Sequence, residues 1–152
     1  MSTARVVAVL LLASAASAGL ASGGAPEPAK PADPDFAAAQ KAIQGKAWPE
    51  AARLLRVVLE RKGPSADVHN LLGFAERNQG HLDAAFAHYE KALQLDPKHK
   101  GAHEYVGEAY LLAGNLAKAE EHLAALDKLC FLSCEEYRDL KKSVAAYKRA
   151  HP

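Results

Sequence analysis

Cys130 and Cys134, the only two cysteines of the 152-residue chain, are the residues whose type and spacing most directly suggest chemistry. An even number of cysteines favours a disulfide in a protein that passes into an oxidising compartment. One cysteine is expected to end a helix and the other to open the next, which brings the two Cα atoms within bonding reach. We therefore expect a Cys130–Cys134 disulfide. Because its loop is short, it should add only about 2 kcal/mol of stability.

A second hypothesis gives the same two cysteines an active role. A cysteine in the first turn of a helix has a stabilised thiolate, which lowers the pKa of its thiol. With Cys130 as its resolving partner, Cys134 would make the chain an exported thiol-redox or soft-metal-binding protein, for example for Cu(I). Against this hypothesis, Glu135 and Glu136 oppose a thiolate, and the spacing is not the Cys-x-x-Cys of thioredoxins.

Four histidines fall into two sets of equivalent positions, His69 with His103 and His88 with His122. The two members of each set should lie on neighbouring helices about 10 Å apart, which is too far to share a metal ion. We therefore expect partly packed or solvated histidines, no metal site and no cofactor. Because no Ser/His/Asp set, glycine-rich phosphate loop or pair of catalytic carboxylates stands out, the sequence does not predict an enzyme.

The helices that must position these residues follow a repeated pattern of small and large apolar side chains. The pattern has a period of about 34 residues, with small residues where helices approach closely and large apolar ones between them. It is clearest over residues 66–99 and recurs over residues 100–133 and 32–65, at Gly73, Leu82, Ala85 and Tyr89, then Gly107, Leu116, Ala119 and Leu123, and Ala39, Trp48, Ala51 and Leu55. This pattern resembles the tetratricopeptide repeat (TPR).

A last helix is expected over residues 134–149. Ser133 and Glu136 have the spacing of a capping box, so the helix should begin at Cys134 or Glu135. Its apolar stripe at helical spacing would cover the exposed end of the array, at Tyr137, Leu140, Val144 and Tyr147. The predicted fold is all-α, a TPR α-solenoid of about three helix pairs plus a C-terminal capping helix, over residues 34–150.

The N-terminus has the features of an export signal. Residues 1–18 carry one basic residue, an apolar run over residues 6–12 and a small-residue tract that ends at Ala18. This is typical of a signal peptide cleaved after Ala18, because the run is far shorter than the ~20 residues that a membrane anchor needs. Residues 19–33 are rich in Ala, Pro and Gly and are expected to form a disordered tether. We expect secretion across the inner membrane into the periplasm.

The charge balance argues against two classes of partner. The leader contains Arg5 and no acid, so its removal lowers Lys+Arg from 19 to 18, against 18 Asp+Glu. A net charge of zero with neutral histidines gives no support for binding nucleic acid or an anionic membrane surface. No later segment is long and apolar enough to be a membrane span. The TPR resemblance implies that the partner is another protein or a peptide.

Two positions depart from the simple pattern. Trp48 stands where the other repeats have leucine, and we interpret it as a core or rim anchor. Glu76 stands where the repeat usually has a large aromatic and where the third repeat has Tyr110. A carboxylate on that face must reach solvent or find a cation.

The TPR resemblance implies a function and a site. TPR arrays bind peptides or protein surfaces in a concave groove lined by the first helix of each pair. The positions that face this groove hold Phe36, Gln40, Ile43, Asn70, Phe74, Arg77, Glu104, Glu108 and Leu111, and the capping helix adds Arg138 and Lys142. The resemblance thus implies a non-enzymatic protein–protein interaction adaptor. A third hypothesis is a structural subunit whose groove is filled by its own tether.

One TPR subclass clamps the C-terminal carboxylate of its ligand with Lys, Asn and Arg at set positions. In this chain those positions hold Phe36, Gln40, Leu71, Gly101 and Tyr105. The clamp is therefore absent, and the role of a co-receptor for chaperone tails is disfavoured.

Overall fold

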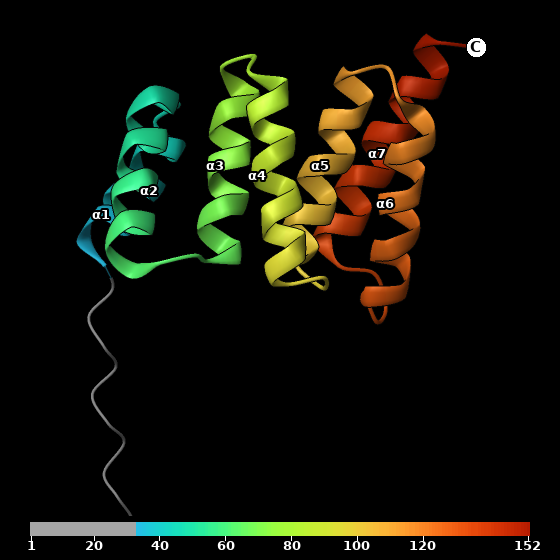
Figure 1. Cartoon of the computed structure of the whole chain (residues 1–152). Coiled ribbons are helices and arrows are strands. Elements are labelled where there is room, and N and C mark those ends of the chain that lie inside the picture. The colour runs from blue at the N-terminus through green and yellow to red at the C-terminus, as the bar shows by residue number, and fades with distance from the viewer. Residues whose placement is uncertain (1–32) are drawn as a thin grey trace, which may run out of the picture. The chain divides into compact units, whose positions relative to one another are not determined.

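The computed structural model describes residues 33–152, which form seven α-helices and no strand (Figure 1). The expected leader and residues 19–32 of the expected tether lie outside the described residues. No helix in the described range is long and apolar enough to cross a membrane. The helices are α1 (Pro34–Gln44), α2 (Trp48–Lys62), α3 (Ala66–Asn78), α4 (Leu82–Leu95), α5 (Lys100–Leu112), α6 (Leu116–Leu129) and α7 (Glu135–Ala150).

The helices pack in chain order as three hairpins followed by a single helix (Figure 1). The hairpins are α1 with α2, α3 with α4 and α5 with α6, and each packs against the next. Helix α7 lies against both α5 and α6. The expected all-α solenoid with a terminal capping helix is therefore confirmed.

Helix α1 begins where its sequence predicts. Asp33 Oδ1 accepts hydrogen bonds from the backbone N–H groups of Asp35 (3.0 Å) and Phe36 (3.2 Å). Pro34 occupies the first helical position, where its missing N–H costs nothing. Arg61 of α2 reaches back to Asp33 (2.5 Å) and Asp35 (2.8 Å), so the cap also ties α1 to α2.

The turns inside the hairpins show why the first repeat is irregular. Gly80 (φ +84°) and Gly114 (φ +78°) adopt the left-handed conformation in the second and third hairpins. In the first hairpin the glycine, Gly45, comes one residue early, and Lys46 adopts the left-handed conformation instead (φ +56°). A side chain disfavours this conformation because its Cβ crowds the backbone.

The repeat glycines are sites of close helix packing. A Cβ on Gly73 would lie 2.6 Å from the ring of Tyr89, which is fully buried. A Cβ on Gly107 would lie 2.6 Å from the Leu140 side chain of α7. The second hairpin therefore covers its glycine with its own second helix, whereas in the third hairpin the capping helix covers it.

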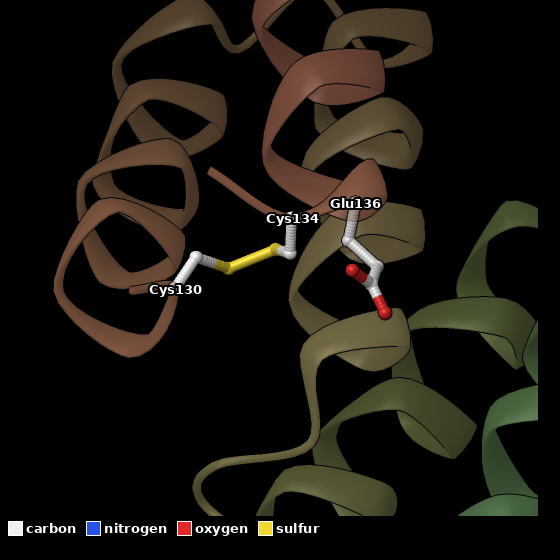
Figure 2. A group of neighbouring side chains, drawn as sticks. All are labelled: Cys130, Cys134 and Glu136. Atoms are coloured by element: carbon white, nitrogen blue, oxygen red, sulfur yellow. A yellow bond between two sulfur atoms is a disulfide. The ribbon is translucent and has the colours of Figure 1, made fainter. Parts of the chain in front are cut away.

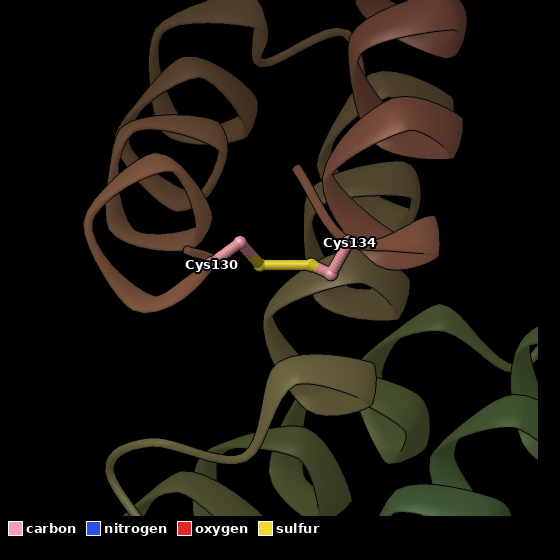
Figure 3. Close-up of a disulfide and its surroundings, with 2 residues drawn as sticks. All are labelled: Cys130 and Cys134. Carbon is pink, nitrogen blue, oxygen red and sulfur yellow. A yellow bond between two sulfur atoms is a disulfide. The ribbon is translucent and has the colours of Figure 1, made fainter. Parts of the chain in front are cut away.

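A disulfide joins Cys130, at the end of α6, to Cys134, before α7 (Figure 3). The two Cα atoms are 5.4 Å apart. The expected capping box is wrong: Cys134 is the N-cap, and no side chain caps the helix. The reason lies in the closed loop, where Leu132 (φ +61°) and Ser133 (φ +67°) both adopt the left-handed conformation. Helix α7 nevertheless begins at Glu135, one of the two expected starts.

The loop that the disulfide closes holds its apolar residues in solvent. Phe131 is 92% exposed and Leu132 is 85% exposed. Cys130 itself is buried against Leu126 and Leu140, so the bond attaches the start of α7 to the core between α5, α6 and α7.

Candidate functional site

Arg77 of α3 lies at the centre of a polar network between α3 and α5. Its side chain is only 10% exposed, and Nη1 donates to Glu108 Oε2 (2.6 Å) and to the carbonyl oxygen of Tyr105 (3.2 Å). The guanidinium also lies over the rings of Phe74 (5.2 Å) and Tyr105 (5.5 Å). Because its charge is already paired and largely shielded, Arg77 serves to join α3 to α5. We call Arg77, Glu108 and Tyr105 the groove floor, since they line the hollows described below.

An aromatic row crosses the same face. Trp48 meets Phe74 edge-on, with ring centroids 5.6 Å apart, and Phe74 packs against Tyr105 at 4.7 Å. The row therefore links the start of α2 to the middle of α3 and α5. The interpretation of Trp48 as an anchor agrees with its half-buried position.

Three adjoining hollows form one groove along α3, α5 and α7, which we call the α5 groove. The first, of about 310 Å³, includes Asn70, Glu104, Tyr105, Glu135, Glu136 and Asp139. The second, of about 380 Å³, shares Glu104 and Asp139 with it and is lined further by Glu108, Lys142, Ser143 and Ala146. The third, of about 310 Å³, shares Glu108 and Ser143 and reaches Arg77, Asn78, Leu111 and Leu112.

The α5 groove is acidic near the start of α7. Burial raises the pKa of Glu104 to about 8, and the neighbouring carboxylates of Glu108, Asp139 and Glu136 add to this effect, while Arg77 opposes it. At neutral pH the Glu104 carboxyl therefore mostly holds its proton. A positive charge that entered the groove would reverse this balance by favouring the carboxylate.

The predicted groove residues divide into those that line the hollows and those that do not. Phe36 and Ile43 pack against the core of the first two repeats, and Gln40 is exposed. Arg138 is exposed and lines none of the hollows described above. The structure brings the remaining predicted residues to one face, at Asn70, Phe74, Arg77, Glu104, Glu108, Leu111 and Lys142.

The sequence interpretation missed several residues of this face. Glu135, Glu136, Asp139 and Ser143 of α7 line the groove. Their spacing of three and four residues is the signal that would have found them, because such positions share one face of a helix. Tyr105 was considered only as a vacant clamp position, although it stacks under Arg77.

Glu76 has the cation that its buried position requires. Its side chain is 5% exposed and pairs with Arg56 of α2, and its Oε2 lies 2.8 Å from His81 Nδ1. The carboxylate thus joins α2, α3 and the start of α4, in the position where the next repeat has Tyr110.

The histidines are partly packed, as expected, but they also pair within each hairpin, a contact that the sequence analysis did not consider. His69 and His88 bring their Nδ1 atoms within 3.1 Å, and His103 and His122 bring theirs within 2.9 Å. The partners are 19 residues apart and lie on the two helices of one hairpin, whereas the sequence comparison paired histidines one whole repeat apart. Burial lowers the pKa of His122 to about 4, with a further contribution from His103, so His122 is neutral at pH 7.

One group of metal-type ligands occurs in residues 33–152, namely Cys130, Cys134 and Glu136 (Figure 2). Their ligand atoms lie within 4.8 Å of one another. The two sulfur atoms are bonded to each other, however, so neither can offer the thiolate that a soft metal needs.

Comparison with known proteins gives matches of sequence and of fold. Two sequence profiles described as tetratricopeptide repeat match residues 36–100 and 77–143. A search of curated proteins found no significant match to the sequence.

The fold resembles that of type III secretion chaperones. The translocator chaperone SycD of Yersinia enterocolitica has a TM-score of 0.68 and 19% identity, over 76% of this chain and 82% of its own. SycD in complex with a peptide of the translocator YopD has a TM-score of 0.64 and 21% identity, over 76% and 88%. PcrH of Pseudomonas aeruginosa, in complex with the chaperone binding region of PopD, has a TM-score of 0.67 and 16% identity, over 78% and 91%.

Proposed function

This chain belongs to the tetratricopeptide repeat family, and we propose that it is a non-enzymatic adaptor that binds a segment of a partner protein in the α5 groove. The observation that carries the proposal is the continuity of the three hollows along α3, α5 and α7. Two chaperones of similar fold are in complex with a partner's peptide or binding region, which supports the same use of the fold here.

The rigidity of the groove floor supports this proposal. Arg77, Glu108 and Tyr105 are held to one another by hydrogen bonds and stacking, so the floor is organised before a partner arrives. A preorganised surface loses less conformational entropy on binding, and its affinity is correspondingly higher.

We also propose that the mature chain begins near residue 19 and acts in the periplasm. The features of residues 1–18 support export. The disulfide between Cys130 and Cys134 suits an oxidising compartment. Mass spectrometry of protein recovered from the native periplasm checks both points. A mature N-terminus after Ala18 and two unalkylated cysteines are expected, and an intact leader on cytosolic protein would contradict the proposal.

Affinity capture with a blocked groove tests the adaptor proposal. The mature protein serves as bait in periplasmic extract, beside Ser143→Arg, which places a long side chain in the groove between α5 and α7. Asp127→Arg, at an exposed position on α6, is the matched control. We expect one partner to be held by the native protein and the control and to be lost from Ser143→Arg. Equal capture by all three baits would place the binding surface elsewhere.

A further inference from the structure

We propose that the hollow between α3, α5 and the start of α7 is a subsite for a positively charged side chain, an arginine guanidinium, of the bound segment. We call it the Asn70 subsite, lined by Asn70, Glu104, Tyr105, Glu135, Glu136 and Asp139. The inference rests on the proposed function and names the chemistry of the partner at this point of the groove.

The charges of the subsite all have one sign. Four of its lining residues are acidic, and none is Lys or Arg. Lys142 lines the adjoining hollow, and Arg77 is paired with Glu108, so neither enters this one. A cation placed here would therefore meet several carboxylates with no competing lysine or arginine on its walls.

Asn70 is the second and independent observation. The residue is only 5% exposed, and its Oδ1 atom is buried without a hydrogen-bond partner. A buried carbonyl oxygen left in this state costs free energy, which a ligand N–H donor would recover once the amide turns toward the hollow. Gly101 leaves room beside the amide, because a Cβ there would lie 3.1 Å from Asn70 Nδ2. The wall of the subsite thus contains an unpartnered amide acceptor next to acidic groups.

The spread of the acidic groups favours a guanidinium over a metal ion. Within the described residues, the one group of three metal-type ligand atoms lying within 4.8 Å is Cys130, Cys134 and Glu136. Glu104, Glu135 and Asp139 therefore do not converge on a point, as the ligands of a metal ion must. A guanidinium carries five N–H donors in a planar fork, so it can reach separated acceptors.

Glu104 makes binding depend on pH. Burial raises its pKa most, Glu108 of α5 and Asp139 and Glu136 of α7 raise it further, and Arg77 of α3 lowers it. A bound cation favours the ionised carboxylate, so Glu104 must release its proton when an arginine binds. The affinity should therefore rise as the pH rises toward about 8 and level off above it.

Titration with single amino acids, followed by ¹H–¹⁵N NMR of the mature protein, tests the subsite. The probe is N-acetyl-arginine amide, and N-acetyl-citrulline amide, its neutral isostere, is the control. We expect arginine to shift the Asn70 side-chain amide and the Gly101 backbone amide, and citrulline to leave both in place. Binding should tighten between pH 6 and pH 8.

Two variants and a metal titration complete the experiment. Glu104→Gln together with Glu136→Gln should weaken arginine binding at least tenfold at pH 8, whereas Glu60→Gln, at an exposed site on α2, should leave it unchanged. Equal shifts by citrulline, shifts outside the subsite, or no shift at saturating probe would overturn the proposal. So would CaCl2 shifting the same amides more strongly than arginine. Because capture by the native groove is measured separately, the subsite can fail while the adaptor proposal stands.

Discussion

Glu104 shows how one side chain couples the groove to the stability of the fold. Its pKa of about 8 exceeds its ordinary value of 4.5, chiefly because the carboxyl is partly removed from water. Between these two pH values the folded chain holds a proton that the unfolded chain has released. Folding stability must therefore fall as the pH rises across this window, and the loss is complete above pH 8.

Replacing Glu104 with glutamine should remove this dependence. We expect Glu104→Gln to match the native protein below pH 4.5 and to be more stable above pH 8 by on the order of 1 kcal/mol, a figure reduced for the solvent that reaches the groove. Urea unfolding at pH 4, 6 and 9 measures the difference, with Glu60→Gln as the control. A constant difference at all three pH values would show that Glu104 is not the titrating group.

The buried Glu76 carboxylate should depend on Arg56. Arg56→Met removes the main cation and leaves only His81 beside the carboxylate, which should cost about 1–3 kcal/mol of stability. In the Glu76→Gln background the same change should cost much less, because no buried charge remains to be compensated. A double-mutant cycle by chemical denaturation gives the coupling free energy between Arg56 and Glu76. Strictly additive effects would mean that these two side chains do not stabilise each other.

Sequence reasoning predicted the helices and their order, but it did not predict which polar side chains meet between two helices. It predicted that Glu76 must reach solvent or find a cation, but it could not name Arg56, which lies 20 residues away on another hairpin. It compared histidines at the repeat period and so missed that His103 and His122 face each other within one hairpin. Such contacts depend on how two helices rotate about their axes, which an averaged repeat pattern does not specify.

At the scale of the element, the first hairpin has a correctable defect. Lys46 adopts the left-handed conformation that glycine supplies in the other two hairpins. Lys46→Gly should therefore stabilise the fold by about 0.5–1 kcal/mol, since it removes the strain of the Cβ at a modest entropic cost. Lys41→Gly, inside α1, should instead destabilise by about 1 kcal/mol. Urea midpoints at constant m-value measure both, and destabilisation by Lys46→Gly would contradict the turn geometry.

The disulfide should act on one element only. Reduction of Cys130–Cys134 should loosen the start of α7 without unfolding the array, because a solenoid is stabilised mainly by contacts between neighbours. Hydrogen exchange should accelerate in α7 and remain unchanged in α1 to α4. Because Glu136 and Asp139 belong to α7, arginine binding at the Asn70 subsite should weaken in parallel. Global unfolding on reduction would show that the bond stabilises more than the capping helix.

The elements themselves were largely predictable. The 34-residue pattern indicated all three hairpins. In the second and third hairpins its small residues, Gly73 and Gly107, lie where a Cβ would collide with Tyr89 or Leu140. The start of α7 was also predicted, but its capping was not. A disulfide-closed loop with two residues in the left-handed conformation replaces the expected Ser133 cap. Local capping rules do not include a covalent constraint of this kind.

At the scale of the whole molecule, the repeat array and its last helix together form one binding surface. Helix α7 covers the end of the core through Leu140 and Val144, while the side next to this core face presents Glu136, Asp139 and Ser143 to the groove. The capping helix is therefore also a wall of the site. The sequence indicated α7 mainly as a cap. It therefore predicted the core residues Leu140 and Val144 but not the groove residues Glu136, Asp139 and Ser143.

Photo-crosslinking around the array tests the central claim most directly. A photoreactive amino acid replaces Lys142, which lines the α5 groove, or Lys128, which is exposed on α6. The full chain is expressed in its native cells and irradiated, and the products are identified by mass spectrometry. The account predicts that position 142 crosslinks to a segment of one partner protein and that position 128 does not. Crosslinking of the same partner from position 128 alone, or equally from both positions, would contradict binding in the groove, as would crosslinks from position 142 to residues 19–33 of the same chain.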